Sequence, residues 1–253
     1  MSKILVFVNQ KGGVGKTTSA LNIGAYFALS GKRTLLVDFD PQGNMSSGVG
    51  ADKNGLTVYD AISGICKTSE AIQKTVIEKL SVLPANINLS GATIELVDVD
   101  KREHFLENAL LQVKDVYDYV LIDCPPSLGI LTLNGLVAAD EVLVPLQCEY
   151  FALEGLTLLL KTVKRVQSGL NKKLEIGGIF FTMYDSRTRL AQEVVQQVST
   201  YFEDRVLKTI IPRNVRLSEA PSHGLPICKY EPSSIGAKSY NKLAEEILKR
   251  GEK

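Results

Sequence analysis

The sequence has few of the residues that build metal centres and disulfide frameworks. Its only histidines, His104 and His223, lie far apart and have no companion at ligand spacing, so we expect no transition-metal site. The chain of 253 residues has four cysteines, which are Cys66, Cys124, Cys148 and Cys228. No two of them form a C-x-x-C pair, which argues against a zinc site or a disulfide framework. We expect buried free thiols instead.

Long apolar runs and an excess of charge are also absent. No apolar run approaches the roughly 20 residues that a membrane-spanning helix needs. The apolar part of the first segment, MSKILVFVN, is too short for a signal peptide, so we expect no export. With 29 Lys and Arg against 28 Asp and Glu, the net charge is +1. This balance argues against a protein that coats nucleic acid over its whole surface, but it is compatible with a local basic patch.

Short apolar runs alternate with longer amphipathic stretches along the chain. The apolar runs predict strands at 3–9, 33–38, 79–83, 118–123, 140–145, 175–182 and 206–211. The apolar spacing between them predicts helices at 16–30, 101–114, 152–168, 187–201 and 234–249. Strands that are apolar throughout are typical of a parallel sheet covered by helices on both faces. The alternation therefore predicts an α/β fold with a doubly wound, mostly parallel sheet.

The segment NQKGGVGKTT has the pattern of a phosphate-binding loop. It follows an apolar run and opens a predicted helix at Lys16, which is the context that this motif requires. The loop contains three glycines, which are Gly12, Gly13 and Gly15. They free the backbone so that successive N–H groups turn toward an anion, which the positive end of the helix also faces. Lys16 can reach the β- and γ-phosphates, and the Thr17 hydroxyl can complete the shell of a Mg²⁺ ion.

This loop departs from the usual pattern in two ways. The pattern G-x-x-x-x-G-K-[ST] has a glycine where this chain has Gln10. The loop also carries a second lysine, Lys11, although one lysine is enough for the phosphates. From the residues alone, Lys11 has no assigned role.

Aspartates follow two of the predicted strands. Asp123 ends the run 118–123, so its carboxylate is expected beside the phosphates, in the Walker B position that holds Mg²⁺ directly or through water. Asp38 and Asp40 lie two residues apart after another strand, so an extended chain points both the same way. Asp40 enters the turn DPQGN and is predicted to orient a water against the γ-phosphate. The alternative for Asp40 is a turn-forming residue before proline.

Five segments together resemble the ParA/Soj family of chromosome-partitioning ATPases, within the wider deviant Walker A group that includes MinD. They are KGGVGKTT at 11–18, DFDPQGN at 38–44, LIDCPPSLG at 121–129, CEYFALEG at 148–155 and IPRNVRLSEAPSHG at 211–224. The resemblance covers almost the whole chain. It implies a single P-loop ATPase domain over residues 1–253, with ATP and Mg²⁺ as cofactors.

The resemblance supplies a role for the second lysine. In the family, the lysine that matches Lys11 reaches across a dimer that sandwiches two nucleotides, to the partner's phosphates. A second cation over the triphosphate offsets charge that develops during hydrolysis, and it makes ATP favour the dimer. Gly12 and Gly13 then allow two backbones to approach closely. By the same resemblance, the catalytic residues are Lys11, Lys16 and Asp40.

The resemblance also implies the ligand positions. The nucleotide-binding residues are Lys11, Gly12, Gly13, Val14, Gly15, Lys16, Thr17, Thr18, Pro212 and Asn214. The metal-binding residues are Thr17, Asp38 and Asp123. In similar proteins the loop with Pro212 and Asn214 borders the adenine, and an asparagine amide offers both a donor and an acceptor to a base edge. The alternative for this loop is a strand-ending turn.

Members of the family bind DNA without sequence preference when they are ATP dimers, and a ParB-like partner stimulates their slow hydrolysis. The positions that match the family's DNA contacts are Arg187 and Arg216. Further basic residues expected on the same face are Arg189, Lys161, Lys164 and Arg165, the last three on one side of a helix. The alternative for these lysines is a solvated helix face. The resemblance implies a cytoplasmic, nucleoid-associated protein.

A MinD-like positioning ATPase that acts on a membrane or a protein cargo is the alternative function. The predicted helix 234–249 carries one apolar stripe of Tyr240, Leu243, Ala244, Ile247 and Leu248. Its polar face has charges of both signs and it lacks tryptophan and phenylalanine, whereas a membrane-surface helix favours a basic face and bulky anchors. We therefore expect this helix to dock on the protein's own core, with no membrane partner. Because the loop begins at Lys11, we expect no N-terminal helix-turn-helix domain.

Overall fold

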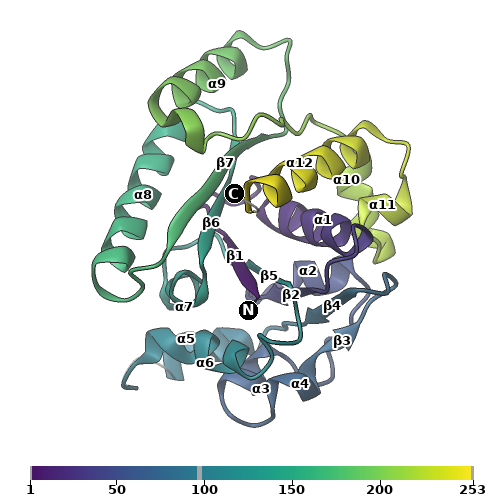
Figure 1. The fold of residues 1–253 in the computed structure, drawn as a ribbon, viewed down its shortest axis with the longest axis vertical. Coiled ribbons are helices and arrows are strands. Elements are labelled where there is room, and N and C mark those ends of the chain that lie inside the picture. Colours follow the sequence, from purple (N-terminus) through teal and green to yellow (C-terminus); the bar gives the residue numbers. More distant parts are fainter. Residues whose placement is uncertain (1, 96–98, 252–253) are drawn as a thin grey trace.

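A single seven-stranded sheet runs through the protein in the order β3-β4-β2-β5-β1-β6-β7 (Figure 1). The structure is a computed structural model that describes residues 2–95 and 99–251. The strands are β1 (Lys3–Phe7), β2 (Thr34–Asp38), β3 (Gln73–Lys74), β4 (Leu80–Leu83), β5 (Tyr119–Asp123), β6 (Glu141–Gln147) and β7 (Glu175–Thr182). Neighbouring strands pair in parallel except at the edge, where the two-residue β3 runs antiparallel to β4. The predicted fold class is confirmed.

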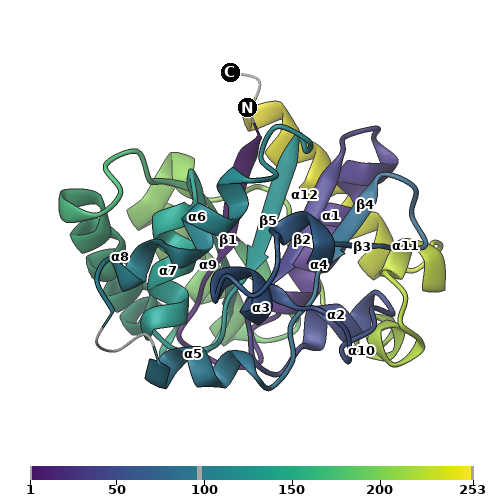
Figure 2. The same ribbon diagram turned by 90° about the horizontal axis from the view of Figure 1, so that it is seen from below.

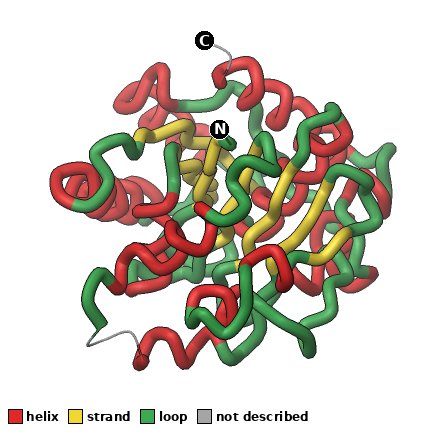
Figure 3. Tube along the Cα trace, turned by 60° about the horizontal axis from the view of Figure 1, so that its bottom comes forward, coloured by secondary structure: helices red, strands yellow, loops and turns green. Residues whose placement is uncertain are grey.

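Helices lie on both faces of this sheet (Figures 2 and 3). The longer ones are α1 (Lys16–Leu29), α7 (Ile130–Ala138), α8 (Ala152–Gly169), α9 (Arg189–Phe202) and α12 (Ile235–Gly251). The shorter ones are α2 (Asn44–Gly48), α3 (Val58–Ile62), α4 (Thr68–Ala71), α5 (Leu89–Glu95), α6 (Phe105–Leu111), α10 (Arg216–Glu219) and α11 (Ile227–Tyr230). Three 3-10 turns, η1 (Arg102–His104), η2 (Glu203–Arg205) and η3 (Ala220–His223), complete the described elements.

The central strands are apolar throughout because both of their faces are covered. In β1, Leu5 and Phe7 pack into a cluster with α1 and α12. Val6 points the other way, into a cluster with α6, α7 and α8. All three side chains are fully buried. This alternation between two apolar cores is what the period of two along a strand produces in a doubly covered sheet.

The C-terminal helix α12 packs beside α1 on one face of the sheet (Figure 1). Tyr240, Leu243, Ala244 and Ile247 are buried there, and Leu248 packs at the edge of the same cluster. The predicted docking of this stripe on the core is confirmed. Among residues 2–95 and 99–251, no helix is long and apolar enough to cross a membrane.

The predicted strand at 206–211 is wrong. Val206 forms only an isolated bridge with Ile179. The N–H groups of Leu207 and Ile211 donate to the β7 carbonyls of Ile179 and Phe181 at 2.8 and 2.9 Å. Between them, the N–H groups of Lys208 and Thr209 donate to the Glu246 carboxylate of α12 at 2.7 and 2.9 Å. The segment has the apolar composition of a strand, but a side chain from a distant helix interrupts its pairing with β7.

Helices were missed or displaced where the apolar pattern is ambiguous. The predicted helix 101–114 is a 3-10 turn followed by the shorter α6, and the predicted helix 187–201 begins only at Arg189. Helix α7 was not predicted, because most of its residues are buried and it shows no polar face.

Candidate functional site

The glycine-rich loop joins the carboxyl end of β1 to the start of α1 at Lys16. Gly13 and Gly15 have φ angles of 74° and 85°, in the left-handed region where other residues are strained. Gly12 has no positive φ, and an added Cβ would meet nothing closer than Pro126 at 3.9 Å. The loop therefore depends on glycine conformation at 13 and 15, and its backbone turns directly into the positive end of α1.

The two loop lysines occupy different environments. Lys16 is 6% exposed, and its Nζ donates to the Lys11 carbonyl at 3.1 Å. Burial lowers the pKa of Lys16, although the nearby Asp123 and Asp40 oppose the shift. The Lys11 side chain is about half exposed and forms an ion pair with Glu149, just after β6. Lys16 thus points into the protein beside acidic groups, whereas Lys11 lies at the surface.

Asp38 and Asp123 are register partners on the neighbouring strands β2 and β5, and both are fully buried. Asp38 Oδ2 accepts hydrogen bonds from the Ser46 backbone N–H at 2.8 Å and the Ser46 hydroxyl at 2.6 Å. Burial nevertheless raises the pKa of Asp38 to about 6. Burial, with a contribution from Asp38, also raises the pKa of Asp123 well above its ordinary value, although Thr17 and Lys16 oppose the shift.

Neither oxygen of Asp123 has a hydrogen-bond partner of normal geometry among the described residues. A buried carboxylate without such partners is costly unless a cation neutralises it. Within residues 2–95 and 99–251, no group of three or more His, Cys, Asp or Glu is arranged to hold a metal ion by itself. A site with one or two carboxylates suits Mg²⁺, which keeps several waters and takes its other ligands from phosphates. Asp123, Asp38 and Thr17 fit such an ion.

Asp40 lies in the turn that follows β2 and is 7% exposed. Its backbone N–H donates to Asp38 Oδ1 at 3.3 Å, and its own Oδ1 accepts from the Gln42 N–H at 3.0 Å. The other carboxylate oxygen of Asp40 has no hydrogen bond to a described residue. The turn continues through Gly43, whose φ is 64° and where an added Cβ would lie 2.7 Å from the Ala85 carbonyl oxygen. Asp40 is therefore held close to Lys16 with one oxygen available.

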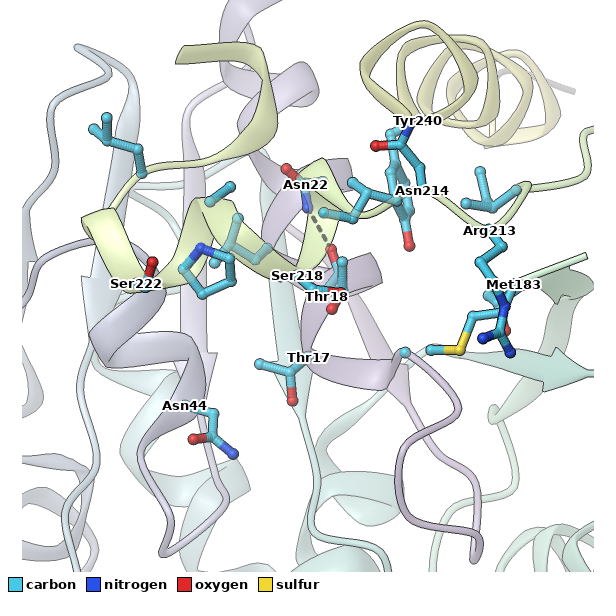
Figure 4. A pocket seen from close by; sticks show the side chains of 18 of the residues that line it. Thr17, Thr18, Asn22, Asn44, Met183, Arg213, Asn214, Ser218, Ser222 and Tyr240 are labelled. Atoms are coloured by element: carbon cyan, nitrogen blue, oxygen red, sulfur yellow. Dashed lines mark hydrogen bonds between the residues drawn. The ribbon is translucent and has the colours of Figure 1, made fainter. Parts of the chain in front are cut away.

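A cavity of about 570 Å³ opens beside the loop (Figure 4). Thr17 and Thr18 at the start of α1 line one side, and Pro212 and Asn214 line another. Tyr240 of α12 also lines it, and its hydroxyl hydrogen-bonds to Ser19 at 2.9 Å. The structure thus brings the predicted loop and the predicted base-binding residues to one cavity, although about 200 residues separate them in the chain.

Some lining residues were not found from the sequence. Asn44 and Ser47 of α2 reach the cavity from the turn that carries Asp40. Tyr240 appeared in the sequence only as part of the apolar stripe of a C-terminal helix. The one sequence feature that could have indicated its role is that a tyrosine in a buried stripe needs a hydrogen-bond partner for its hydroxyl.

Arg187 and Arg216 lie just outside this cavity, each in an ion pair within the chain. The Arg187 guanidinium binds both oxygens of Asp185, at 2.9 and 2.7 Å, and holds the pKa of that carboxyl well below its usual range. Arg216 Nη1 donates to Glu219 Oε2 at 2.8 Å. The Arg187 side chain is 86% exposed and that of Arg216 50%, so both remain accessible from solvent.

The other basic residues are more scattered than the sequence predicted. Lys161 and Lys164 line a groove of about 680 Å³ together with Arg205. All three predicted basic residues of α8 are exposed at i, i+3 and i+4 spacing, but Arg165 lines a different groove, between α7 and α8. Arg189 pairs with Glu193 at 2.8 Å along α9.

Comparison with known proteins agrees with this geometry. Residues 2–176 match a family described as AAA domain. The chain is 69% identical over 250 residues to the chromosome-partitioning ATPase Soj of Treponema pallidum (strain Nichols), which covers 99% of this chain and 98% of that protein. It is 54% identical over 253 residues to the sporulation initiation inhibitor protein Soj of Bacillus subtilis (strain 168), covering 99% and 100%.

A solved structure shows the same architecture. The cobyrinic acid a,c-diamide synthase from Mycobacterium smegmatis with bound ADP and magnesium has a TM-score of 0.87 and 39% identity, covering 100% of this chain and 96% of that one. The sequence matches and this structural match each extend over nearly the whole chain. The chain therefore belongs to the Soj/ParA family of chromosome-partitioning ATPases.

Proposed function

We propose that the protein hydrolyses ATP with Mg²⁺ to control a dimer that binds DNA without sequence preference. The observation that carries the ATPase part is the buried Asp123 carboxylate, which lacks hydrogen-bond partners beside Lys16 and Thr17. A Mg²⁺ ion with its triphosphate supplies the positive charge and ligands that this arrangement needs. The ADP and magnesium in the Mycobacterium smegmatis structure support the same assignment.

The residues of the site divide the work as follows. The loop from Lys11 to Thr18 surrounds the phosphates with backbone N–H groups, and Lys16 neutralises charge on the β- and γ-phosphates. Thr17, Asp38 and Asp123 would hold Mg²⁺, which would neutralise the charge that develops on the β- and γ-phosphates. Asp40 uses its available oxygen to orient a water in line with the γ-phosphate. Hydrolysis then breaks the bond between that phosphate and the β-phosphate.

The cavity beside the loop takes the nucleoside. Its volume of about 570 Å³ is in the range of small-molecule sites. Pro212 offers an apolar surface to the base, and the Asn214 amide offers a hydrogen bond to the base edge.

Lys11 acts on the nucleotide of a second copy of the chain. It is exposed and lies at the same edge of the sheet as Lys16, so a second protomer stacked on this edge brings it to the partner's phosphates. An added Cβ at Gly13 would meet nothing within 4 Å, which permits a close approach of the two loops. ATP favours this dimer over ADP because the γ-phosphate contributes to the interface.

The dimer presents two copies of Arg187 and Arg216 to a DNA duplex. Contacts from arginine to phosphates give affinity that depends on salt and not on sequence. Two patches on one dimer bind a duplex far better than one, so DNA binding follows dimerisation. In the cell, the ATP dimer is associated with the nucleoid, and a ParB-like partner speeds hydrolysis and releases it.

Steady-state hydrolysis of ATP by three proteins tests the catalytic assignment. The wild-type protein is expected to release phosphate slowly in Mg²⁺, Lys16→Ala to lose nucleotide binding, and Asp40→Ala to bind ATP without hydrolysing it. Binding of a fluorescent nucleotide distinguishes Lys16→Ala, which should not bind it, from Asp40→Ala, which should. Hydrolysis by Asp40→Ala at the wild-type rate would overturn the role of Asp40.

A further inference from the structure

The wall of the cavity that faces Thr17 is built from two loops joined to each other. One follows β7 and contains Tyr184, and the other precedes α10 and contains Arg213. The Tyr184 N–H donates to the Ile211 carbonyl at 3.0 Å, and the Arg213 N–H donates to the Tyr184 carbonyl at 3.1 Å. Figure 4 shows Met183, Arg213 and Asn214 on the same side of the cavity. The two loops therefore form one continuous wall.

The two candidate DNA contacts follow the residues of this wall closely in the sequence. Arg187 comes three residues after Tyr184, and Arg216 comes two residues after Asn214. Both arginines are exposed, whereas Asn214 is half-buried and lines the cavity. The residue proposed to contact the nucleotide and those proposed to contact DNA thus belong to the same two short segments.

A single side chain connects the two proposed contacts. Asn214 Oδ1 accepts a hydrogen bond from the Arg216 backbone N–H at 3.0 Å. One lone pair of the amide oxygen is therefore engaged at the start of α10, and the amide NH₂ of Asn214 can donate to a base.

Helix α10 needs such an anchor because it has only four residues, too few to be stable alone. Two further contacts hold it. Leu217 packs against Gly236 of α12, where an added Cβ would lie 2.8 Å from Leu217 Cγ. Glu219 accepts from Arg216 and, at 3.2 Å, from the Tyr230 hydroxyl. Asn214 and Leu217 both line the cavity, and of these two Asn214 has the polar group that can bind a base.

We propose that Asn214 is a positioning residue for Arg216, so that a base in the cavity holds Arg216 ready for DNA. A base that accepts a hydrogen bond from the Asn214 amide NH₂ fixes the amide plane. The fixed amide oxygen then holds the Arg216 N–H and the first turn of α10. This inference rests on the proposed function, and it adds to dimerisation a second way in which ATP controls DNA binding.

The test uses an Asp40→Ala parent, which retains ATP, with Asn214→Ala or Asn214→Ser added. Serine keeps a neutral oxygen that accepts the same N–H, whereas alanine has none. Dimerisation at saturating ATP is measured by analytical ultracentrifugation, and DNA binding by fluorescence anisotropy over a range of salt. We expect both variants to dimerise. Serine has no NH₂ for the base, so Asn214→Ala and Asn214→Ser should both bind DNA roughly fivefold more weakly than the parent, a loss typical of one weakened contact.

The salt dependence separates positioning from general damage. Loss of the Arg216 contact lowers the slope of log affinity against log salt by about 1 per protomer. Both Asn214 variants should therefore show the slope of Arg216→Ala. DNA binding by Asn214→Ala equal to that of the parent overturns the inference. Binding like that of the parent by Asn214→Ser also overturns it, because an acceptor for the Arg216 N–H would then suffice without a bond to the base. A parent that binds no DNA in ATP overturns the proposed function itself, and the inference with it.

Discussion

Lys11 and Glu149 form an ion pair within one chain, although 138 residues separate them. Glu149 follows β6, and Lys11 follows β1, so the pair lies at the edge of the sheet where the phosphates are proposed to bind. Both side chains are about half exposed, at 52% and 47%. Such a solvated pair contributes at most about 1 kcal/mol. Lys11 can therefore leave Glu149 for the triphosphate of a second copy.

If Lys11 exchanges partners in this way, removing Glu149 should favour the dimer. We expect Glu149→Gln to tighten ATP-dependent dimerisation by about two- to fivefold, because a weak competitor for Lys11 is lost. Lys11→Ala should abolish the dimer while retaining ATP. Sedimentation at several protein concentrations measures both effects, and Glu78→Gln, an equal change of charge at an exposed site beside β4, is the control. Weaker dimerisation of Glu149→Gln would show that Glu149 supports the interface.

The buried Asp123 is expected to reduce the stability of the protein without ligands. Asp123→Asn replaces a buried carboxyl whose oxygens lack hydrogen-bond partners of normal geometry, so it should raise the free energy of unfolding by roughly 1–3 kcal/mol. The same variant should lose the extra stability that Mg²⁺ and ATP give to the wild type. Chemical denaturation with and without both ligands measures the two effects together. A variant less stable than the wild type without ligands would contradict the interpretation of Asp123.

The pKa of Asp38 predicts how stability depends on pH. Because burial raises this pKa from 3.8 to about 6, the folded protein binds more protons than the unfolded chain between these values. The free energy of unfolding without ligands should therefore fall as pH rises from 4 to 6, with up to about 3 kcal/mol from Asp38. Asp38→Asn should show a shallower fall across the same range. Parallel denaturation series for the two proteins provide the comparison, and identical slopes would refute the assignment.

Glu219 competes with DNA phosphates for Arg216. Its pair with Arg216 is solvent-accessible, so Glu219→Gln should raise the DNA affinity of the ATP dimer about two- to fivefold. The salt slope should stay the same, because the number of phosphate contacts does not change. Anisotropy titrations against Glu78→Gln separate this effect from a general change of charge. A fall in affinity would instead mean that Glu219 holds Arg216 in its binding position.

The phosphate loop and the carboxylates were predictable because their signals are local. Left-handed φ angles at Gly13 and Gly15 require the residues that the motif contains. Asp38 and Asp123 end apolar runs, and strands of a parallel sheet bring such ends to one edge. The resemblance to a known family then added Pro212 and Asn214, which do line the cavity beside the loop.

Other features depend on contacts that no local pattern encodes. The pairing of segment 206–211 with β7 is interrupted because Glu246, 37 residues beyond Thr209, accepts the N–H groups of Lys208 and Thr209. The two hydrogen bonds from Ser46 to Asp38 depend on the path of the chain after β2. The intramolecular partner of Lys11 is likewise visible only when β1 and β6 lie side by side. In each case the hydrogen-bond or ion-pair partner is a side chain far along the sequence or around a turn.

DNA binding by Asp40→Ala tests the central claim most directly. The protein is titrated onto duplexes of unrelated sequence in ATP and in ADP, over a range of salt concentrations. The account predicts binding in ATP only, with similar affinity for every sequence and a steep loss as salt rises. Absence of DNA binding in both nucleotides, or equal binding in both, would contradict it. In the first case, binding to lipid vesicles or to a protein cargo would favour a positioning ATPase.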